Sequence, residues 1–130
     1  MEDEFAQKVT LADAPVFEPA HVHRSGLTEA EVQRRFATIR SVGEECVAED
    51  ELLALLRNKG EFVAYDGFEP SGRMHIAQGI LRARNINKIT RSGGTFILWV
   101  ADWFALLNNK MAGDLERIRT VGRYMVEVWR

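Results

Sequence analysis

The chain has 130 residues, a length that fits a single domain. Hydrophobic residues make up 46% of it and charged residues 28%, a composition that supports a buried core and excludes an intrinsically disordered protein. No apolar run approaches the length of about 18 residues that a transmembrane helix needs, so no membrane span is expected.

Two features of the sequence predict a cytoplasmic protein. Cys46 is the only cysteine, so no internal disulfide can form and a reducing compartment fits. We expect Cys46 to fill space in the core rather than to act as a reactive thiol. The chain begins Met1-Glu2-Asp3-Glu4, whereas secretory and mitochondrial targeting segments are basic and contain few acidic residues.

The net charge of −2 is unevenly distributed. Residues 1–64 contain 7 Lys and Arg against 13 Asp and Glu, whereas residues 82–130 contain 9 against 4. A basic half of this kind suits an anionic partner such as nucleic acid. Solvated helix faces are the simpler explanation for the same residues.

Residues 1–26 show no clear periodicity and are interrupted by Pro15 and Pro19, so we expect a flexible N-terminal extension. Within it, His21 and His23 flank a valine. On a strand this spacing places both imidazoles on one face, where a metal can bind. No further ligand cluster is visible nearby, so a surface pair is favoured and no metal site is predicted.

Two helices are predicted after this extension. The first begins with a capping box, in which Thr28 bonds a helical amide and Glu31 reaches back, and it continues to Arg40. The second begins near Glu49 and ends at Gly60. The apolar positions that define these helices are Val32, Phe36 and Ile39 in the first and Leu52, Leu53 and Leu56 in the second.

A strand–helix–strand unit follows. Phe62–Tyr65 is a short apolar run that predicts a strand, and the helical period runs from about His75 to Arg91. Residues 95–101 form a continuous apolar run, which predicts a strand buried on both faces. The short turns favour two parallel strands with a right-handed crossover.

After Asp102 the chain is expected to turn through Asn108 and Asn109, and a last helix is predicted from about Asp114. Its apolar face carries Leu115, Ile118, Gly122, Met125 and Trp129.

The loop at residues 67–72, Gly-Phe-Glu-Pro-Ser-Gly, joins the first strand to its helix. A strand that breaks at glycines and leads into a helix forms an anion site, because the first helical amides point outward without partners and the helix dipole adds to their attraction. Gly67 and Gly72 allow a ligand close to the backbone, and Pro70 fixes one bend.

Residues 67–79, GFEPSGRMHIAQG, resemble the HIGH motif of class I aminoacyl-tRNA synthetases, in the form found in tyrosyl-tRNA synthetases of the archaeal–eukaryotic branch. His75-Ile76-Ala77-Gln78 occupies the four HIGH positions. Residues 100–108, VADWFALLN, are similar to the ADLHAYLN segment of the same family. Together with the helix before the loop, the resemblance covers residues 30–130.

The resemblance implies an α/β protein, in which N-terminal helices and a βαβ unit form the first half of a Rossmann-like parallel-sheet catalytic domain. Residues 27–130 would be the N-terminal part of that domain, with the KMSKS signature and the anticodon-reading module outside this sequence. The implied activity is that of a tyrosine–tRNA ligase, which activates L-tyrosine with ATP and Mg²⁺ and transfers it to tRNA(Tyr). A homodimer or pseudo-dimer is expected for the complete protein, and little activity for the fragment alone.

The resemblance also assigns roles to residues. Catalysis falls to His75 and Gln78. Tyrosine binding falls to Tyr65, Gly67, Glu69, Trp99 and Asp102. ATP binding falls to Pro70, Ser71, Gly72, Arg73, Met74, His75, Ile76, Ala77 and Gln78. The sequence departs from the family pattern at two positions, with alanine at 77 in place of glycine and glutamine at 78 in place of histidine.

Other roles stay open for several of these residues. Trp99 equally suits the core, Asp102 a structural bond to a loop amide, Glu69 a loop cap and Arg73 a solvated position. A tryptophanyl-tRNA synthetase is the nearest alternative, which Tyr65 disfavours because its hydroxyl suits a phenol. A non-catalytic interaction module is the other, and such a module has no need of the glycine loop.

Overall fold

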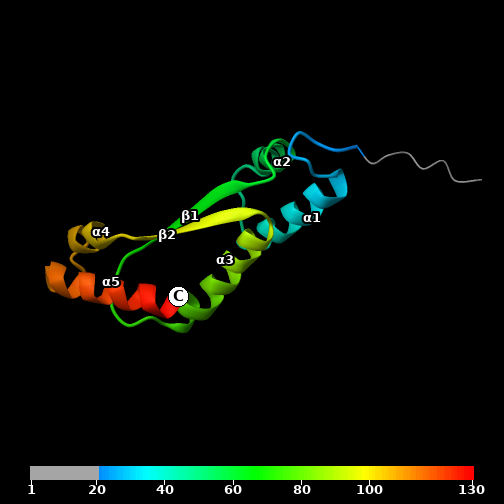
Figure 1. Cartoon of the computed structure of the whole chain (residues 1–130). Helices are drawn as coiled ribbons and strands as arrows, with labels where there is room; N and C mark the ends of the chain where they lie inside the picture. The colour runs from blue at the N-terminus through cyan, green and yellow to red at the C-terminus, as the bar shows by residue number, and fades with distance from the viewer. Residues whose placement is uncertain (1–20) are drawn as a thin grey trace, which may run out of the picture.

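The computed structural model describes residues 21–130 (Figure 1). Most of the predicted extension, residues 1–20, lies outside the described residues. Its last residues are attached to the helices that follow. Val22 pairs with Thr28 in an isolated antiparallel bridge, and the His23 amide donates to the Leu27 carbonyl at 2.8 Å.

Within the described residues the chain forms, in order, α1 (Glu29–Arg40), α2 (Glu49–Asn58), β1 (Phe62–Phe68), η2 (Ala77–Leu81), α3 (Arg82–Arg91), β2 (Gly94–Val100), α4 (Asp102–Leu107), η3 (Lys110–Gly113) and α5 (Leu115–Trp129). Figure 1 shows α1 and α2 at one end of the strand pair and α4 and α5 at the other. α3 contacts β2 and α1. No helix among residues 21–130 has both the length and the apolar character needed to span a bilayer.

The two strands are parallel, as predicted, with partners running from Phe62 and Gly94 to Phe68 and Val100. β1 is longer than predicted, because it continues past Tyr65 to Phe68. The prediction that the loop opens at Gly67 is therefore wrong. Pairing with β2 keeps the backbone extended there, and the Ala101 amide adds a 2.7 Å hydrogen bond to the Phe68 carbonyl.

One face of this strand pair is open among the described residues. Along both strands, exposed and partly buried positions alternate with a period of two. The large apolar side chains on the open face are Val63 (66% exposed), Tyr65 (72%), Ile97 (51%) and Trp99 (58%). The prediction that residues 95–101 are buried on both faces is wrong for the described chain, because the helices cover only one side of the pair.

The main core lies at the α1–α2 end. Leu27, Val32 and Leu56 are its buried residues. Phe36, Ile39, Leu52, Leu53 and Phe62 pack against them. The capping box is confirmed: the Glu31 amide donates to Thr28 Oγ1 at 3.3 Å, and Glu31 Oε2 accepts from the Thr28 amide at 2.9 Å.

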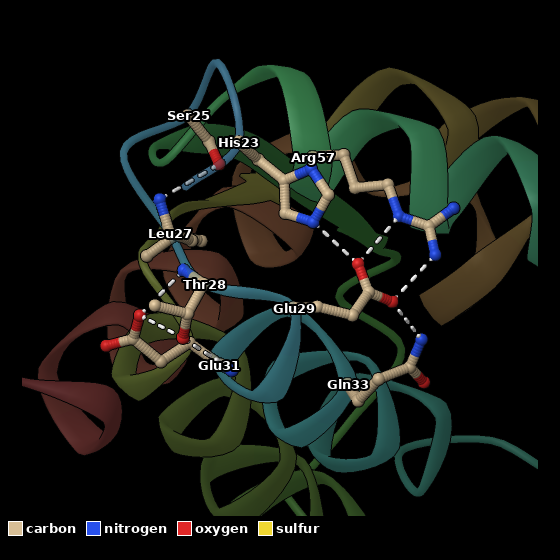
Figure 2. Close-up of polar contacts among 8 residues, drawn as sticks. All are labelled: His23, Ser25, Leu27, Thr28, Glu29, Glu31, Gln33 and Arg57. Atoms are coloured by element: carbon tan, nitrogen blue, oxygen red, sulfur yellow. Dashed lines mark hydrogen bonds and ion pairs between the residues drawn. The ribbon is translucent and has the colours of Figure 1, made fainter. Parts of the chain in front are cut away.

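A carboxylate at the start of α1 gathers polar groups from three segments (Figure 2). Glu29 accepts hydrogen bonds from Arg57 Nη2 and Gln33 Nε2, both at 2.7 Å, and its Oε2 lies 2.6 Å from His23 Nε2. The Arg57 hydrogen bond, followed by that from Gln33, lowers the pKa of Glu29 to about 2. His23 therefore pairs with a carboxylate, and no group of three or more metal-ligating side chains occurs among residues 21–130.

The helix predicted from about His75 to Arg91 is present, but its first turn is wider than an α-helical turn. Residues Ala77–Leu81 form a π-helical turn, η2, which continues directly into α3. π-Helical turns inside α-helices are rare and are often found at functional sites. The helix is followed by Gly93, whose φ of 91° and close approach to the Gly60 carbonyl leave no room for a side chain.

The turn predicted at Asn108 and Asn109 is confirmed, and Asn109 is left-handed. The segment between β2 and this turn forms a short helix that was not predicted, α4, which ends at Leu107. α5 begins after Asp114 as predicted, and the Asp114 carboxylate caps it by accepting from the Arg117 amide at 3.0 Å. The predicted inner face of α5 is confirmed by its buried residues, Ile118, Gly122 and Met125.

Candidate active site

The open face of the strand pair brings together three of the predicted tyrosine-binding residues. Tyr65 and Gly67 lie two positions apart on β1, so both belong to the exposed face, and Trp99 is the register partner of Gly67 on β2. Tyr65 sits in the middle of β1 rather than at its end, since the strand is longer than predicted. A Cβ at Gly67 would meet no atom within 4 Å, so the surface between the two aromatic side chains is unobstructed.

The loop from Glu69 to Met74 is held at its base and open at its tip. Pro70 is fully buried, and its ring lies 3.4 Å from the position of a Cβ on Gly122 of α5. Glu69 Oε1 accepts a 2.6 Å hydrogen bond from Asn108 Nδ2, at the end of α4. Ser71 and Arg73 are exposed. The loop is thus anchored on α4 and α5, which the sequence analysis did not foresee.

Gly72, between Ser71 and Arg73, has a φ of 154° that L side chains rarely adopt. Of the two glycines in the predicted loop, only Gly72 thus has a backbone conformation that favours glycine, because Gly67 does not have a positive φ.

His75 is exposed at the point where the helix begins. Its carbonyl accepts from the amides of Gln78 at 3.0 Å and Gly79 at 2.9 Å. Its imidazole has no hydrogen bond to any described residue, so the ring is available to a ligand. Gln78 turns back toward the helix start, where its Oε1 lies 3.5 Å from the His75 amide. The Gln78 carbonyl accepts from Trp129 Nε1 at 3.2 Å, which attaches the π turn to the end of α5.

The two departures from the family pattern differ in their surroundings. Ala77 is exposed, so its methyl group meets solvent rather than a packed wall. Gln78 is partly buried and is already engaged by the contacts to His75 and Trp129. Ile76, the remaining member of the four, is 76% exposed.

Asp102 is separated from the open face. It is the first residue of α4, and its carboxylate accepts from Arg119 Nε of α5 at 2.9 Å and from the Trp103 amide at 2.8 Å. The hydrogen bond from Arg119 lowers the pKa of Asp102 below its ordinary value. Asp102 and Arg119 line a hollow of about 380 Å³ beside α5. These contacts match the structural alternative for Asp102 rather than a place beside Tyr65 and Trp99.

A second hollow, of about 500 Å³, lies beside the loop. Its lining consists of Gly72, Arg73, Met111, Arg117, Thr120, Val121 and Tyr124. Two guanidinium groups, those of Arg73 and Arg117, thus border one concave surface. Arg117 was not among the predicted site residues. The available signal was its position in the first turn of a predicted helix.

Comparison with known proteins identifies the family. The sequence model described as class I tRNA synthetases (W and Y) matches residues 57–129, more than half of the chain. The chain belongs to this family. Its fold is therefore the first part of a Rossmann-like class I synthetase domain, as predicted.

The relatives compared here are both named as tyrosine–tRNA ligases. The chain is 56% identical over 100 residues to cytoplasmic tyrosine–tRNA ligase 1 of Arabidopsis thaliana, covering 77% of the chain and 26% of that protein. It is 36% identical over 85 residues to a tyrosine–tRNA ligase of Sulfolobus acidocaldarius, with 65% and 23% covered. The chain thus spans about a quarter of the length of these relatives.

Solved structures of this family support the same grouping. A Leishmania major tyrosyl-tRNA synthetase in complex with tyrosinol matches with a TM-score of 0.72 and 59% identity, covering 75% of this chain and 18% of that one. A tyrosyl-tRNA synthetase from Aeropyrum pernix matches with a TM-score of 0.68 and 34% identity, covering 76% and 30%. The resemblance to tyrosyl-tRNA synthetases seen in the glycine loop is confirmed.

Proposed function

We propose that this chain supplies the tyrosine-binding face and the ATP-binding loop of a tyrosine–tRNA ligase. The relatives named above support this specificity over the tryptophanyl alternative, although the family model includes both enzymes. The observation that carries the proposal is the placement of Tyr65, Gly67 and Trp99 on one open face of a strand pair whose first strand leads through the glycine loop to an exposed His75. An interaction module has no need of that arrangement.

The proposed reaction has two steps. The carboxylate of tyrosine attacks the α-phosphorus of ATP, which forms the mixed anhydride tyrosyl-adenylate and expels pyrophosphate. A hydroxyl of the terminal ribose of tRNA(Tyr) then attacks the tyrosyl carbonyl, loses its proton and releases AMP. Because a carboxylate is already nucleophilic, the first step needs alignment of two anions and stabilisation of charge on the phosphate rather than a strong base.

The tyrosine side of this proposal rests on the open face. Ligands in parallel sheets bind near the carboxyl ends of the strands, where Gly67 and Trp99 lie. The Tyr65 hydroxyl offers a hydrogen bond to the phenol of the substrate, and the missing side chain at Gly67 leaves space for the ring. Trp99 provides a flat apolar wall. Glu69, whose carboxylate accepts from Asn108, supplies a polar group to the same ligand.

The ATP side rests on the loop and the helix start. His75 donates a hydrogen bond from its free imidazole to a phosphate oxygen, and the first amides of the helix add their partial positive charge. Gln78 assists at the same helix turn. The loop residues Pro70, Ser71, Gly72, Arg73 and Met74 and the helical residues Ile76 and Ala77 form the surface against which the nucleotide lies.

Three partners complete the proposal. Mg²⁺ arrives bound to the phosphates of ATP, as is usual for this ion at nucleotide sites. The complete enzyme acts as a homodimer or pseudo-dimer in the cytoplasm. The ligand tRNA(Tyr) follows from the specificity of the relatives.

The proposal is tested by tyrosine-dependent exchange of pyrophosphate into ATP, measured on the protein that contains this chain with tyrosine, phenylalanine and tryptophan in parallel. Of these three amino acids, only tyrosine is expected to support exchange. Tyr65→Phe is expected to lower kcat/KM for tyrosine by about 10- to 100-fold, since the substrate hydroxyl loses a hydrogen-bond partner. Exchange with tryptophan in place of tyrosine would refute the proposed specificity.

The isolated 130-residue chain is expected to show little exchange, because its substrate face stands open to solvent. Exchange near the rate of the larger protein would contradict this expectation. Thermal unfolding of the Tyr65→Phe protein controls for loss of structure. A midpoint equal to that of the unsubstituted protein assigns the lost activity to the hydroxyl.

A further inference from the structure

α3 carries a charge pattern that the active-site proposal does not use. Its ten residues, RARNINKITR, include four basic side chains and no acidic one. Arg82 forms an ion pair with Asp66 on β1. Arg84, Lys88 and Arg91 have no carboxylate partner among residues 21–130.

Arg84 and Arg91 are exposed on the outer side of the helix, and the partly buried Lys88 lies at the edge of that side. The inner side is engaged by Asn85, which donates to the Val42 carbonyl at 3.2 Å, and by Ile89, which packs beside Gly94 of β2. A shallow groove of about 630 Å³ runs along the outer side. Its lining consists of Gly79, Ile80, Ala83, Arg84, Asn87, Lys88 and Arg91, which recur at the spacing of one helical face.

The arrangement is unfavourable for the helix by itself. Arg84 and Lys88 are four residues apart and Lys88 and Arg91 three apart, spacings at which like charges repel. Opposite charges at these spacings would stabilise the helix, yet α3 has none. Lys88 is partly satisfied, because its ammonium donates to the carbonyl and the hydroxyl of Ser41 at 3.2 and 3.0 Å. An ammonium has three donors, so one is left for an anion.

We propose that Arg84, Asn87, Lys88 and Arg91 form a surface that binds the phosphate backbone of RNA. The rise of the helix separates residues 84 and 91 by about 10 Å along its axis, enough for the two side chains to reach different phosphates of one strand. Guanidinium groups bind phosphates in a bidentate manner, and the Asn87 amide adds a neutral donor. The small side chain of Ala83 lets the strand approach the helix closely.

RNA is favoured over an anionic lipid surface because a helix that lies in a membrane needs an apolar row, and this groove has one large apolar residue, Ile80. The choice of RNA over other polyanions rests on the proposed function, which includes tRNA(Tyr). The surface extends from the π turn next to His75 toward the far end of α3. It therefore provides a path along which an RNA strand leads to the loop.

The test measures binding of the 130-residue chain to a fluorescein-labelled tRNA(Tyr) transcript by anisotropy at salt concentrations from 50 to 200 mM, chosen because phosphate contacts are salt-dependent. The variant Arg84→Gln/Arg91→Gln is expected to bind more weakly. The slope of log affinity against log salt is expected to become shallower by about 1.5, since two phosphate contacts are lost. A matched control, Arg24→Gln/Arg130→Gln, removes two charges elsewhere and is expected to keep the slope.

Three results would overturn the proposal: an unchanged slope in the α3 variant, an equal loss in the control, or a loss of binding to phosphatidylserine vesicles without a loss of RNA binding. Circular dichroism of each variant establishes that the helix is intact. Pyrophosphate exchange on the larger protein separates this proposal from the proposed function, because adenylate formation needs no RNA and is expected to persist in the α3 variant. If the larger protein showed no exchange but the chain still bound RNA through α3, the proposed function would be refuted and the RNA-binding surface would be supported.

Discussion

The two ends of the strand pair satisfy their polar side chains in opposite ways. At the α1–α2 end, Glu29 is bonded by His23, Gln33 and Arg57, and the capping box closes on itself. At the other end, the imidazole of His75 has no bond to a described residue, and the tip of the preceding loop is exposed. Side chains whose polar groups are all hydrogen-bonded within the chain stabilise the fold. Polar side chains without such partners are available to a ligand.

The largest effect on stability is expected from a substitution in the core at the α1–α2 end. Leu56 is fully buried between α1 and α2, so Leu56→Ala is expected to lower the free energy of unfolding by about 2–5 kcal/mol. Leu107→Ala is the matched control, since Leu107 is 78% exposed and its loss opens no cavity. Urea denaturation measures both. Equal stability losses in the two variants would show that the α1–α2 contact is not the core of the domain.

Substitution of His75, at the loop end of the strand pair, is expected to change activity without changing stability. His75→Ala is expected to lower kcat of pyrophosphate exchange by about 100-fold, the scale found when one donor to a developing charge is removed. Its unfolding midpoint is expected to stay unchanged, because the ring contacts no described polar group. His21→Ala, which removes an exposed imidazole far from the loop, is expected to leave the rate unchanged. A His75→Ala protein of normal activity would remove the ring from the mechanism.

The helix cap gives a smaller effect. Thr28→Ala removes the acceptor of the Glu31 amide and is expected to lower the free energy of unfolding by about 1 kcal/mol. Thr120→Ala removes the same atoms from an exposed position in the middle of α5, where alanine is a better helix former. Calorimetry on the two variants distinguishes a capping contribution from a general effect of threonine. A stability gain in both would contradict the cap.

The contribution of Glu29 to stability is expected to change with pH only in the acidic range. Glu29 has a folded pKa of about 2 against an ordinary value of 4.5, so its stabilising contribution is complete above pH 4.5 and is lost as pH falls toward 2. Glu29→Gln is therefore expected to flatten the fall in stability across that window relative to the unsubstituted chain. Thermal unfolding between pH 2 and 5 measures it. Parallel curves for the two proteins would show that the Arg57 contact does not favour the ionised carboxylate.

Local sequence patterns predicted the elements whose signals are local. The capping box set the start of α1, and Asp114 marked the start of α5, because a cap is defined within four residues of chain. The resemblance in the glycine loop identified the family from residues 67–79. These predictions needed no knowledge of distant contacts.

Features that depend on pairing between distant segments were missed. The extension of β1 through Gly67 arises from its register with β2, which a glycine-rich sequence conceals. The open face of β2 could not be read from an uninterrupted apolar run, since such a run does not say how many neighbours the strand has. The bond between Asp102 and Arg119 was likewise not predicted, because its two residues lie seventeen positions apart in the sequence.

The contact of Pro70 with Gly122, together with the bond from Trp129 to Gln78, has a consequence for synthesis on the ribosome. The loop at residues 69–74 leaves the exit tunnel well before the helix that holds its base. Until α5 has emerged and docked, the loop lacks its anchor and Gln78 lacks the indole that bonds its carbonyl. The loop therefore takes its final shape late, and a translational pause placed before residue 115 would prolong a nascent state in which the loop is not yet formed.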